Sequence, residues 1–338
     1  MNLIRAAVIL ALACMIAAPL IAQDDLDAQL QSLQDKRAEI KAEMEAANEA
    51  GDRDKYDQLL IEWESVSKQI KDLQSQLQQD TETRNNAIKY YNEGKKYYQQ
   101  GNAGQAVENF KKSLEYDSQN PKVHYMLGVA QVKAKDYPGA LVSLDNAIKI
   151  RSSYAEAYYM KGNVLKRMGR NSEALQAYQE SVKQNPMYSK GYFGMGSVYL
   201  AQKKNRDALS ALQQAVDLDP SYHLAHSSMI QVFINQGKFN QAIEAADKAI
   251  ALKANYWKQY YLKSLAANKA GKFQVAIDAA KGCLKYKANY AGANFEMGQA
   301  YQALGNKPKA LEAYKKCLND RQWRPNAEHH IKILEEEG

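Results

Sequence analysis

The sequence of 338 residues contains 45 lysines and arginines, 38 aspartates and glutamates, five histidines and three cysteines, and its net charge is +7. Neither His223 with His226 nor His329 with His330 has cysteine or carboxylate neighbours at the spacing of a zinc site. A glycine-rich phosphate loop, a serine nucleophile elbow and a paired-carboxylate motif are also missing from the sequence. We therefore expect a protein that is not an enzyme and that binds no metal or cofactor.

The first 22 residues differ in kind from the rest of the chain. Arg5 is followed by an uncharged apolar run from Ala6 to Ala22, and acidic residues follow almost at once. A positive residue, an apolar stretch and a small residue at its end are typical of a secretory signal peptide. We predict a signal peptide over residues 1–22 and a periplasmic mature protein. The alternative is an uncleaved segment that anchors the protein in the membrane, because Leu20 stands where a cleavage site usually has a small residue.

Residues 23–80 carry a different pattern. From Leu26 to Met44, and again from Tyr56 to Leu77, apolar residues recur mostly at alternating steps of four and three. Such heptads predict a coiled-coil seam, and the polar break around Gly51 predicts that the two halves fold back as an antiparallel helical hairpin. A two-helix hairpin is marginal by itself. We expect it to pack on a second copy, on the adjoining part of the chain or on another protein, or only to cap the adjoining part.

The remainder of the chain repeats every 34 residues. Alanine occurs seven times at this interval, a small residue stands seven positions after each alanine, and glycine stands twelve positions before five of them. The alanines are Ala106, Ala140, Ala174, Ala208, Ala242, Ala276 and Ala310. A period of this length is the signature of stacked helical hairpins, which bury their apolar faces only against their neighbours. Small residues at fixed positions let the two helices of a hairpin cross closely.

Two stretches match a known motif best. Residues 155–188 match it with Tyr158, Gly162, Gly169, Ala174, Tyr178 and Pro186, and residues 189–222 with Tyr192, Gly196, Tyr199, Ala208, Ala215 and Pro220. This spacing resembles the tetratricopeptide repeat. The resemblance implies an all-α, right-handed superhelical solenoid of seven helix-turn-helix repeats. They are residues 87–120, 121–154, 155–188, 189–222, 223–256, 257–290 and 291–324, followed by a capping helix over 325–338.

Repeats 5 and 6 depart from the motif. Ile230 and Ser264 replace the glycine of the first helix, and Ala246 and Ala280 replace the aromatic residue of the second helix. Both substitutions fall at positions where the two helices of a repeat approach each other. The departures therefore bear on close helix packing in these two repeats, and not on the fold.

The cysteines of the repeats occupy equivalent positions. Cys283 and Cys317 both stand at the small-residue position, in successive repeats. Stacked helices lie on the order of 10 Å apart, whereas a disulfide requires Cα atoms closer than about 7 Å. We therefore expect two buried thiols. Cys14 lies well inside the apolar run, which argues against a lipid-modified cysteine, and the absence of Asn-x-Ser/Thr favours a bacterial envelope over a eukaryotic secretory pathway.

Charge and aromatic residues suggest what the repeats bind. Residues 24–80 have a net charge of −8 and residues 81–338 a net charge of +14, which favours acidic partners. The positive charge is spread along the repeats, and together with export this argues against nucleic acid. In the family, first-helix residues line a concave groove. Here its fifth position is aromatic in six of seven repeats, and basic residues around it outnumber the acidic Glu156 and Glu296.

Such a groove suits a peptide that bears carboxylates and apolar side chains. The candidate partner-binding residues are Tyr91, Lys95, Lys122, Tyr125, Lys133, Tyr159, Lys166, Arg167, Lys190, Phe193, Lys258, Tyr261, Lys269 and Phe295. Chaperone-binding members of the family clamp a terminal carboxylate with lysines, asparagines and an arginine. That clamp is absent here, since its first lysine position carries aromatic residues or Ser227.

These features predict a non-enzymatic scaffold or adaptor of the bacterial cell envelope that binds an acidic protein or peptide. Two other functions stay open: a regulatory accessory subunit of an envelope enzyme, and a structural protein that assembles when acidic hairpins enter the basic grooves of other copies. Self-association through the hairpin fits the second of these. Membrane contact is expected only if the signal peptide is not cleaved.

Overall fold

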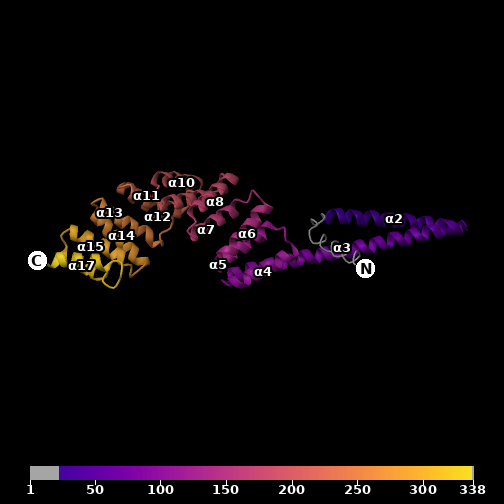
Figure 1. Cartoon of the computed structure of the whole chain (residues 1–338), viewed down its shortest axis with the longest axis horizontal. Helices are drawn as coiled ribbons and strands as arrows, with labels where there is room; N and C mark the ends of the chain where they lie inside the picture. Colours follow the sequence, from indigo (N-terminus) through magenta and orange to yellow (C-terminus); the bar gives the residue numbers. More distant parts are fainter. Residues whose placement is uncertain (1–22, 337–338) are drawn as a thin grey trace, which may run out of the picture. The chain divides into compact units, whose positions relative to one another are not determined.

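The computed structural model describes residues 23–336, in which every regular element is an α-helix (Figure 1). The all-α class predicted from the sequence is therefore confirmed. The predicted signal peptide, residues 1–22, lies outside the described residues. The chain divides into two compact units, the first ending at Val123 and the second beginning at His124. Among the described helices, none combines the length and apolar character that crossing a membrane requires.

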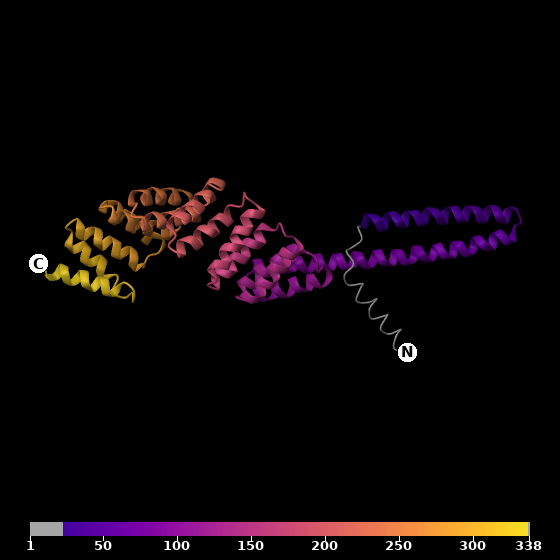
Figure 2. The same cartoon turned by 45° about the horizontal axis from the view of Figure 1, so that its top comes forward.

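Unit 1 begins with a helical hairpin. α2 (Gln23–Glu49) and α3 (Arg53–Gln99) run side by side, and α4 (Ala103–Tyr116) packs on the C-terminal part of α3 (Figure 2). The chain reverses at Gly51, whose φ of 72° costs glycine little. Ile40, Val66 and Ile70 are buried between α2 and α3, so the apolar seam predicted for this region is the line along which the two helices pack.

The second arm of the hairpin and the first helix of repeat 1 are the same element. α3 is a single helix of 47 residues. Residues 81–86, which separate the predicted hairpin from repeat 1, are polar but contain neither glycine nor proline. Nothing in this segment interrupts the backbone hydrogen bonds of a helix, and the helix therefore continues through it.

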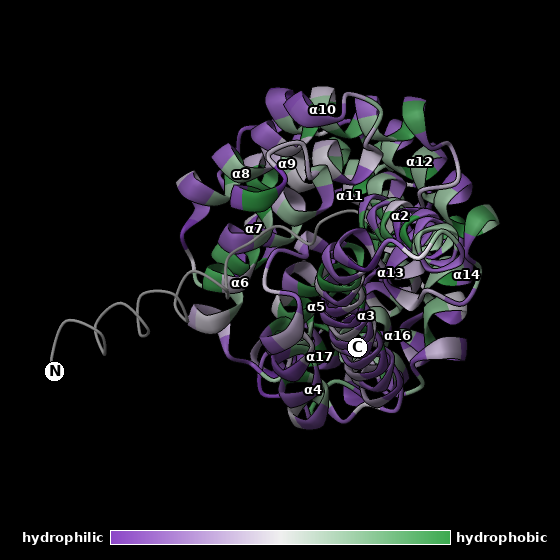
Figure 3. Cartoon of the chain, turned by 90° about the vertical axis from the view of Figure 1, so that its right-hand side faces the viewer, coloured by the Kyte–Doolittle hydropathy of each residue, from purple (hydrophilic) through white to green (hydrophobic). Residues whose placement is uncertain are grey.

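From residue 121 onward, helices alternate between the first and the second position of a repeat. The first helices are α5 (Pro121–Lys133), α7 (Ala155–Arg167), α9 (Ser189–Ala201), α11 (His223–Asn235), α13 (Trp257–Lys269) and α15 (Ala291–Ala303). The second helices are α6 (Tyr137–Ile150), α8 (Asn171–Gln184), α10 (Asn205–Leu218), α12 (Phe239–Leu252), α14 (Phe273–Tyr286) and α16 (Lys307–Lys315). Viewed end-on, α11 and α13 lie nearer the centre of unit 2 than α10, α12 and α14 (Figure 3).

The two helices of a repeat cross at the glycine position. A Cβ atom on Gly162 would lie 2.6 Å from the ring of Tyr178, which is fully buried. The same kind of contact joins a glycine to a large second-helix residue in repeats 1, 2, 4 and 7. In repeat 5 the order is reversed, because Ile230 stands opposite Ala246, whereas repeat 6 has two small residues, Ser264 and Ala280, at these positions. In repeat 5 the two departures therefore compensate each other, and the residues at both crossings are buried.

The small-residue position of the second helix also makes a polar contact in three repeats. Ser113 Oγ donates to the carbonyl of Ala87 at 2.8 Å, and Cys317 Sγ donates to the carbonyl of Ala291 at 3.3 Å. Ser181 makes the same contact in repeat 3. Cys283 and Cys317 are both buried free thiols, and burial raises the pKa of each to about 11. At this position the side chain packs and hydrogen-bonds within its own repeat.

A last helix, α17 (Arg324–Glu336), covers the end of unit 2. Leu334 is buried and Ile331 packs beside it, against the core that contains Phe295 and Tyr314. Glu335 and Glu336 are exposed. α17 therefore has one apolar side against repeat 7 and one charged side toward solvent, as a capping helix requires.

Candidate functional site

The fifth-position aromatic residues of unit 2 form pairs with the last residue of their repeats. Ring centroids are 5.2 Å apart for Tyr125 and Tyr154, and 5.6 Å apart for Tyr159 and Tyr188. Phe193 with Tyr222, and Tyr261 with Tyr290, are paired at 5.0 and 5.1 Å. The last residue of a repeat directly precedes the first helix of the next one. Each pair therefore joins two successive repeats. We call the series of these pairs, together with the residues that replace them in repeats 5 and 7, the aromatic ladder.

The tyrosines of the ladder are uncharged hydrogen-bonding groups. Burial, reinforced by the neighbouring tyrosines, raises the pKa of Tyr188, Tyr222 and Tyr261 well above the ordinary value. Their hydroxyl groups stay protonated at neutral pH and can donate as well as accept hydrogen bonds. The ladder thus offers apolar ring faces with polar ends.

Other residues complete the ladder where the pattern breaks. In repeat 5, Ser227 replaces the aromatic residue, and fully buried Gln259 of the next repeat donates to Ser227 Oγ at 2.9 Å. In repeat 7, Trp323 supplies the second ring, 5.1 Å from Phe295. Phe295 is itself only 6% exposed, under Trp323 and α17. It belongs to the packing of the C-terminal end and does not present a ring to solvent.

Lys166 differs from the other basic candidates of unit 2. Lys133, Arg167, Lys190, Lys258 and Lys269 are exposed. Lys166 is half-buried, and its Nζ donates to Ser197 Oγ at 2.7 Å, on the first helix of the next repeat. Burial lowers the pKa of this lysine. Within residues 23–336 it forms no ion pair with a carboxylate.

The two acidic candidates of unit 2 lie in different surroundings. Glu156 is exposed, whereas Glu296 is buried and accepts a hydrogen bond of 2.7 Å from Asn268 Nδ2 at its Oε2. Burial raises the pKa of Glu296. Asn268 occupies in repeat 6 the position that Lys166 has in repeat 3. Glu296 is therefore a buried carboxylate that accepts from Asn268, and the charge of exposed Lys269 also acts on it and partly offsets the rise in its pKa. The contacts of Lys166 and Asn268 show that this position reaches the next repeat in two repeats.

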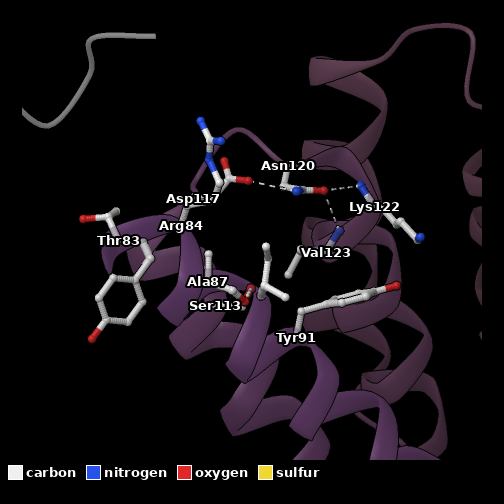
Figure 4. Close-up of a pocket in the computed structure, with 11 residues that line it drawn as sticks. Thr83, Arg84, Ala87, Tyr91, Ser113, Asp117, Asn120, Lys122 and Val123 are labelled. Atoms are coloured by element: carbon white, nitrogen blue, oxygen red, sulfur yellow. Dashed lines mark hydrogen bonds between the residues drawn. The ribbon is translucent and has the colours of Figure 1, made fainter. Parts of the chain in front are cut away.

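In unit 1, Tyr91 borders a cavity. Its ring lies 5.9 Å from that of Phe110, and the Nζ atoms of Lys95 and Lys122 are 5.6 and 5.5 Å from its centroid. The cavity, of about 230 Å³, is bounded by α3, the end of α4 and the start of α5 (Figure 4). Asn120 lies at its edge, where five other repeats have tyrosine.

Sequence reasoning missed the tyrosines at the last position of the repeats. They are Tyr154, Tyr188, Tyr222, Tyr256 and Tyr290. The recurrence of tyrosine in five of seven repeats was the available signal. The recurrence of tyrosine could not be interpreted from the sequence, because only the fold shows that this position faces the fifth residue of the same repeat.

The histidines are engaged in local contacts. His226 Nε2 lies 3.0 Å from the carbonyl oxygen of Pro220, and His330 Nδ1 lies 3.0 Å from Gln302 Oε1. His223 Nε2 is 3.4 Å from Lys253 Nζ. The part of the chain that the structure describes contains no group of three or more His, Cys, Asp or Glu residues arranged to hold a metal ion.

Comparison with models of protein families identifies the type of repeat. Models described as TPR repeat match residues 94–135 and 132–169, and models described as tetratricopeptide repeat match residues 159–223, 193–260, 228–294 and 291–319. No curated protein matches the chain significantly.

Several solved structures share its fold. Pseudomonas aeruginosa pilF matches with a TM-score of 0.57 and 20% identity, over 66% of this chain and 99% of that one. A tetratricopeptide repeat protein from Parabacteroides merdae matches with a TM-score of 0.54 and 15% identity, over 74% and 99% of the two chains. The C-terminal part of a TPR repeat-containing protein from Cytophaga hutchinsonii gives 0.54 and 18%, over 70% and 97%. With models covering most of residues 94–319, this chain belongs to the tetratricopeptide repeat family.

Proposed function

We propose that this protein is a non-enzymatic adaptor of the cell envelope that holds an acidic segment of a partner protein against the first helices of repeats 3 and 4. Tetratricopeptide repeats serve protein–protein interaction, and stacked repeats offer extended surfaces for it. The proposal narrows this general role to one face of unit 2 and one class of partner.

Lys166 carries the proposal. A half-buried ammonium group loses hydration, and here a serine hydroxyl replaces only part of it. A carboxylate would compensate such a cation much better, because hydrogen bonds between charged groups are the strong ones. Tyr159 and Phe193, at the fifth positions of the same two first helices, are partly exposed and supply aromatic surface on these helices. Exposed Arg167 and Lys190 extend the positive charge. Together they favour a partner segment that combines carboxylates with apolar side chains.

The ladder rings are unsuitable for testing this proposal. Tyr159 packs against both Tyr178 and Tyr188, at 5.8 and 5.6 Å between centroids. Its truncation would remove packing inside repeat 3 and between repeats 3 and 4. Loss of binding in a Tyr159→Ala variant would therefore not distinguish a contact with the partner from a loosened repeat. Charge changes at Lys166 avoid this ambiguity.

The test uses Lys166→Met, which keeps the unbranched apolar part of the side chain and removes the charged end. The probe is a fluorescent seven-residue peptide in which Asp and Glu alternate with Leu. We expect its affinity to fall at least tenfold, as for loss of one partner of a desolvated charge pair. Lys183→Met is the matched control, because Lys183 is exposed on the second helix of the same repeat. Equal binding by both variants and the native protein would contradict the proposal.

Export has a separate test. The signal-peptide pattern of residues 1–22 supports a mature protein that begins at Gln23. N-terminal sequencing of the protein from an envelope fraction is expected to start at this residue. Intact Met1 on membrane-bound protein would show an anchor instead.

The division of charge favours self-assembly as a second candidate. Residues 24–80 carry −8 and residues 81–338 carry +14. Acidic hairpins of one copy would then bind the basic repeats of another. Such assemblies should dissociate as salt rises, since screening weakens exposed charge pairs. Sedimentation velocity at 50 and 500 mM salt tests this, and a monomer in both would exclude it.

A further inference from the structure

We propose that the cavity beside Tyr91 is a pocket for one aromatic side chain of an acidic partner segment. The inference rests on the proposed function only in assuming that the protein binds protein segments. The pocket lies entirely in unit 1, between α3, α4 and the start of α5. It is separate from the Lys166 site in unit 2.

Repeat 1 lacks the second side chain that is paired with the fifth-position residue in the other six repeats. The fifth-position residue meets a tyrosine in repeats 2, 3, 4 and 6. In repeat 5 the fifth-position residue contacts Gln259 instead, and in repeat 7 it contacts Trp323. In repeat 1, Tyr91 faces Asn120, and the space that a second ring would fill is the cavity of about 230 Å³. Repeat 1 therefore has the first ring of the pair without the second.

Asn120 is fixed in another role and does not turn into this space. Its Oδ1 accepts from the backbone N–H groups of Lys122 and Val123 at 3.2 and 3.3 Å, and thereby caps α5. Its Nδ2 donates to Asp117 Oδ2 at 2.8 Å (Figure 4). The tyrosines that precede α7, α9, α11, α13 and α15 make no such side-chain cap. Repeat 1 thus has a helix cap in place of the ring.

The walls of the pocket suit an aromatic ring. Ala87, Val123 and the face of Tyr91 line it, and Ile88 and Tyr116 at its rim are 52% and 37% exposed. Large apolar side chains left in solvent around a hollow often mark a binding site. The volume is sufficient, because apolar cavities of about 150 Å³ already bind benzene. A phenyl or phenol group entering here would meet Tyr91 as the ladder tyrosines meet their partners.

The charges around the pocket indicate what accompanies the ring. The ammonium groups of Lys95 and Lys122 lie beside Tyr91, and within residues 23–336 neither forms an ion pair. Asp117, on another wall, accepts from the neutral amide of Asn120 and is one acidic group against these two lysines. Carboxylates on either side of the ligand's aromatic residue would reach the two lysines. The fitting occupant is therefore an extended acidic segment with a single phenylalanine or tyrosine.

The experiment uses the full chain and the capped probe peptide Asp-Glu-Tyr-Asp-Glu, with Asp-Glu-Ala-Asp-Glu as its matched control. Binding is followed by fluorescence anisotropy and by chemical-shift changes at the methyl groups of Val123. We expect the tyrosine peptide to bind at least tenfold more tightly than the alanine peptide. Equal affinity for the two peptides would overturn the proposal.

The first protein variant completes the ladder. Asn120→Tyr would place the protein's own ring in the pocket, and we expect it to lose at least tenfold in affinity for the tyrosine peptide. Asn120→Ser is its control, since serine can cap α5 and leaves the pocket open. Native affinity in a folded Asn120→Tyr protein would refute the pocket. If Lys166→Met weakened peptide binding and Asn120→Tyr did not, the pocket proposal would be wrong and the proposed function would stand. If Asn120→Tyr weakened binding and Lys166→Met did not, the pocket proposal would stand and the proposed Lys166 site would be wrong.

A second pair of variants does not depend on how Asn120→Tyr folds. Ile88→Glu places a carboxylate at the rim, and we expect it to weaken peptide binding at least tenfold. Ile61→Glu is the matched control, because Ile61 is 70% exposed on the same helix and does not line the cavity. Identical affinities for these two variants would also overturn the proposal.

Discussion

Repeats 3 and 5 solve one packing problem in opposite ways. In repeat 3, Gly162 leaves room for Tyr178, and a Cβ on the glycine would lie 2.6 Å from that ring. In repeat 5, Ile230 supplies the bulk from the first helix, and Ala246 stands opposite; both are fully buried. What repeats 3 and 5 share is one large side chain at the helix crossing, and not the residue at either position. Tight packing requires this, because interiors contain few voids.

The largest effect is expected from removing the bulk in repeat 5. Ile230→Gly leaves glycine opposite alanine, so no side chain fills the crossing. We expect a loss of roughly 2–5 kcal/mol from the cavity, with about 1 kcal/mol more for glycine inside a helix. Urea unfolding measures the total, and hydrogen exchange in α11 measures the local loss. Ile230→Val, with an expected cost of about 0.5–1.5 kcal/mol, is the graded control.

The next prediction moves the arrangement of repeat 5 into repeat 3. Gly162→Ile alone overpacks the crossing against Tyr178 and should cost about 1–3 kcal/mol. Adding Tyr178→Ala should recover part of this cost, with a coupling of about 0.5–3 kcal/mol in a double-mutant cycle. Recovery will be incomplete, since Tyr178 also donates to Asn163 Oδ1 at 2.8 Å. Strict additivity of the two changes would break the comparison, because it would mean that the positions do not share one volume.

Repeat 6 allows a finer test. Ser264 stands at the glycine position, and its Oγ donates to the buried carbonyl of Ala276 at 2.8 Å. Ser264→Ala keeps nearly the same volume and removes this hydrogen bond. We expect a loss of about 0.5–1.5 kcal/mol by thermal or urea unfolding. An unchanged midpoint would show that volume alone matters at this position.

The smallest effect concerns pH and separates repeat 7 from repeat 3. Both place a tyrosine against glycine, but Tyr314 also stacks on His330 at 4.9 Å. Burial, and then His329, lower the pKa of His330 from its ordinary value of 6.5. The fold therefore favours the neutral ring, and the unfolded chain binds more protons below pH 6.5. The stability contributed by this contact is fully present above pH 6.5 and is lost as pH falls from there through the lower folded-state pKa of His330.

Hydrogen exchange of α17 at pH 7.5 and pH 5.5 measures this loss. After correction for the intrinsic pH dependence of exchange, we expect weaker protection of the α17 amides at the lower pH in the native protein and no such change in a His330→Phe variant. Amides of α8 in repeat 3, where Tyr178 has no histidine beside it, are the internal control. Equal pH dependence in α8 and α17 would show that the effect is not local to His330.

The sequence was informative wherever a local rule determines structure. The 34-residue period gave repeat boundaries at Pro121, Ala155 and Ser189, where α5, α7 and α9 begin, but not in repeat 1, whose first helix is part of α3. It could not show that Ala246 compensates Ile230, since this depends on which side chains meet across the crossing. The role of Asn120 was hidden for the same reason. Its meaning comes from a ring missing beside Tyr91, and only a fold can show that.

The unbroken helix α3 gives unit 1 a mechanical property. Arg53 starts the helix at the turn of the hairpin, and Ala87 lines the pocket of repeat 1 on the same helix. At about 1.5 Å per residue the two points lie roughly 50 Å apart, with no loop between them to swivel. The helix therefore fixes the distance between a molecule bound at the hairpin tip and a molecule bound in the pocket. A torque applied at the hairpin tip would be transmitted along α3 to the first repeat.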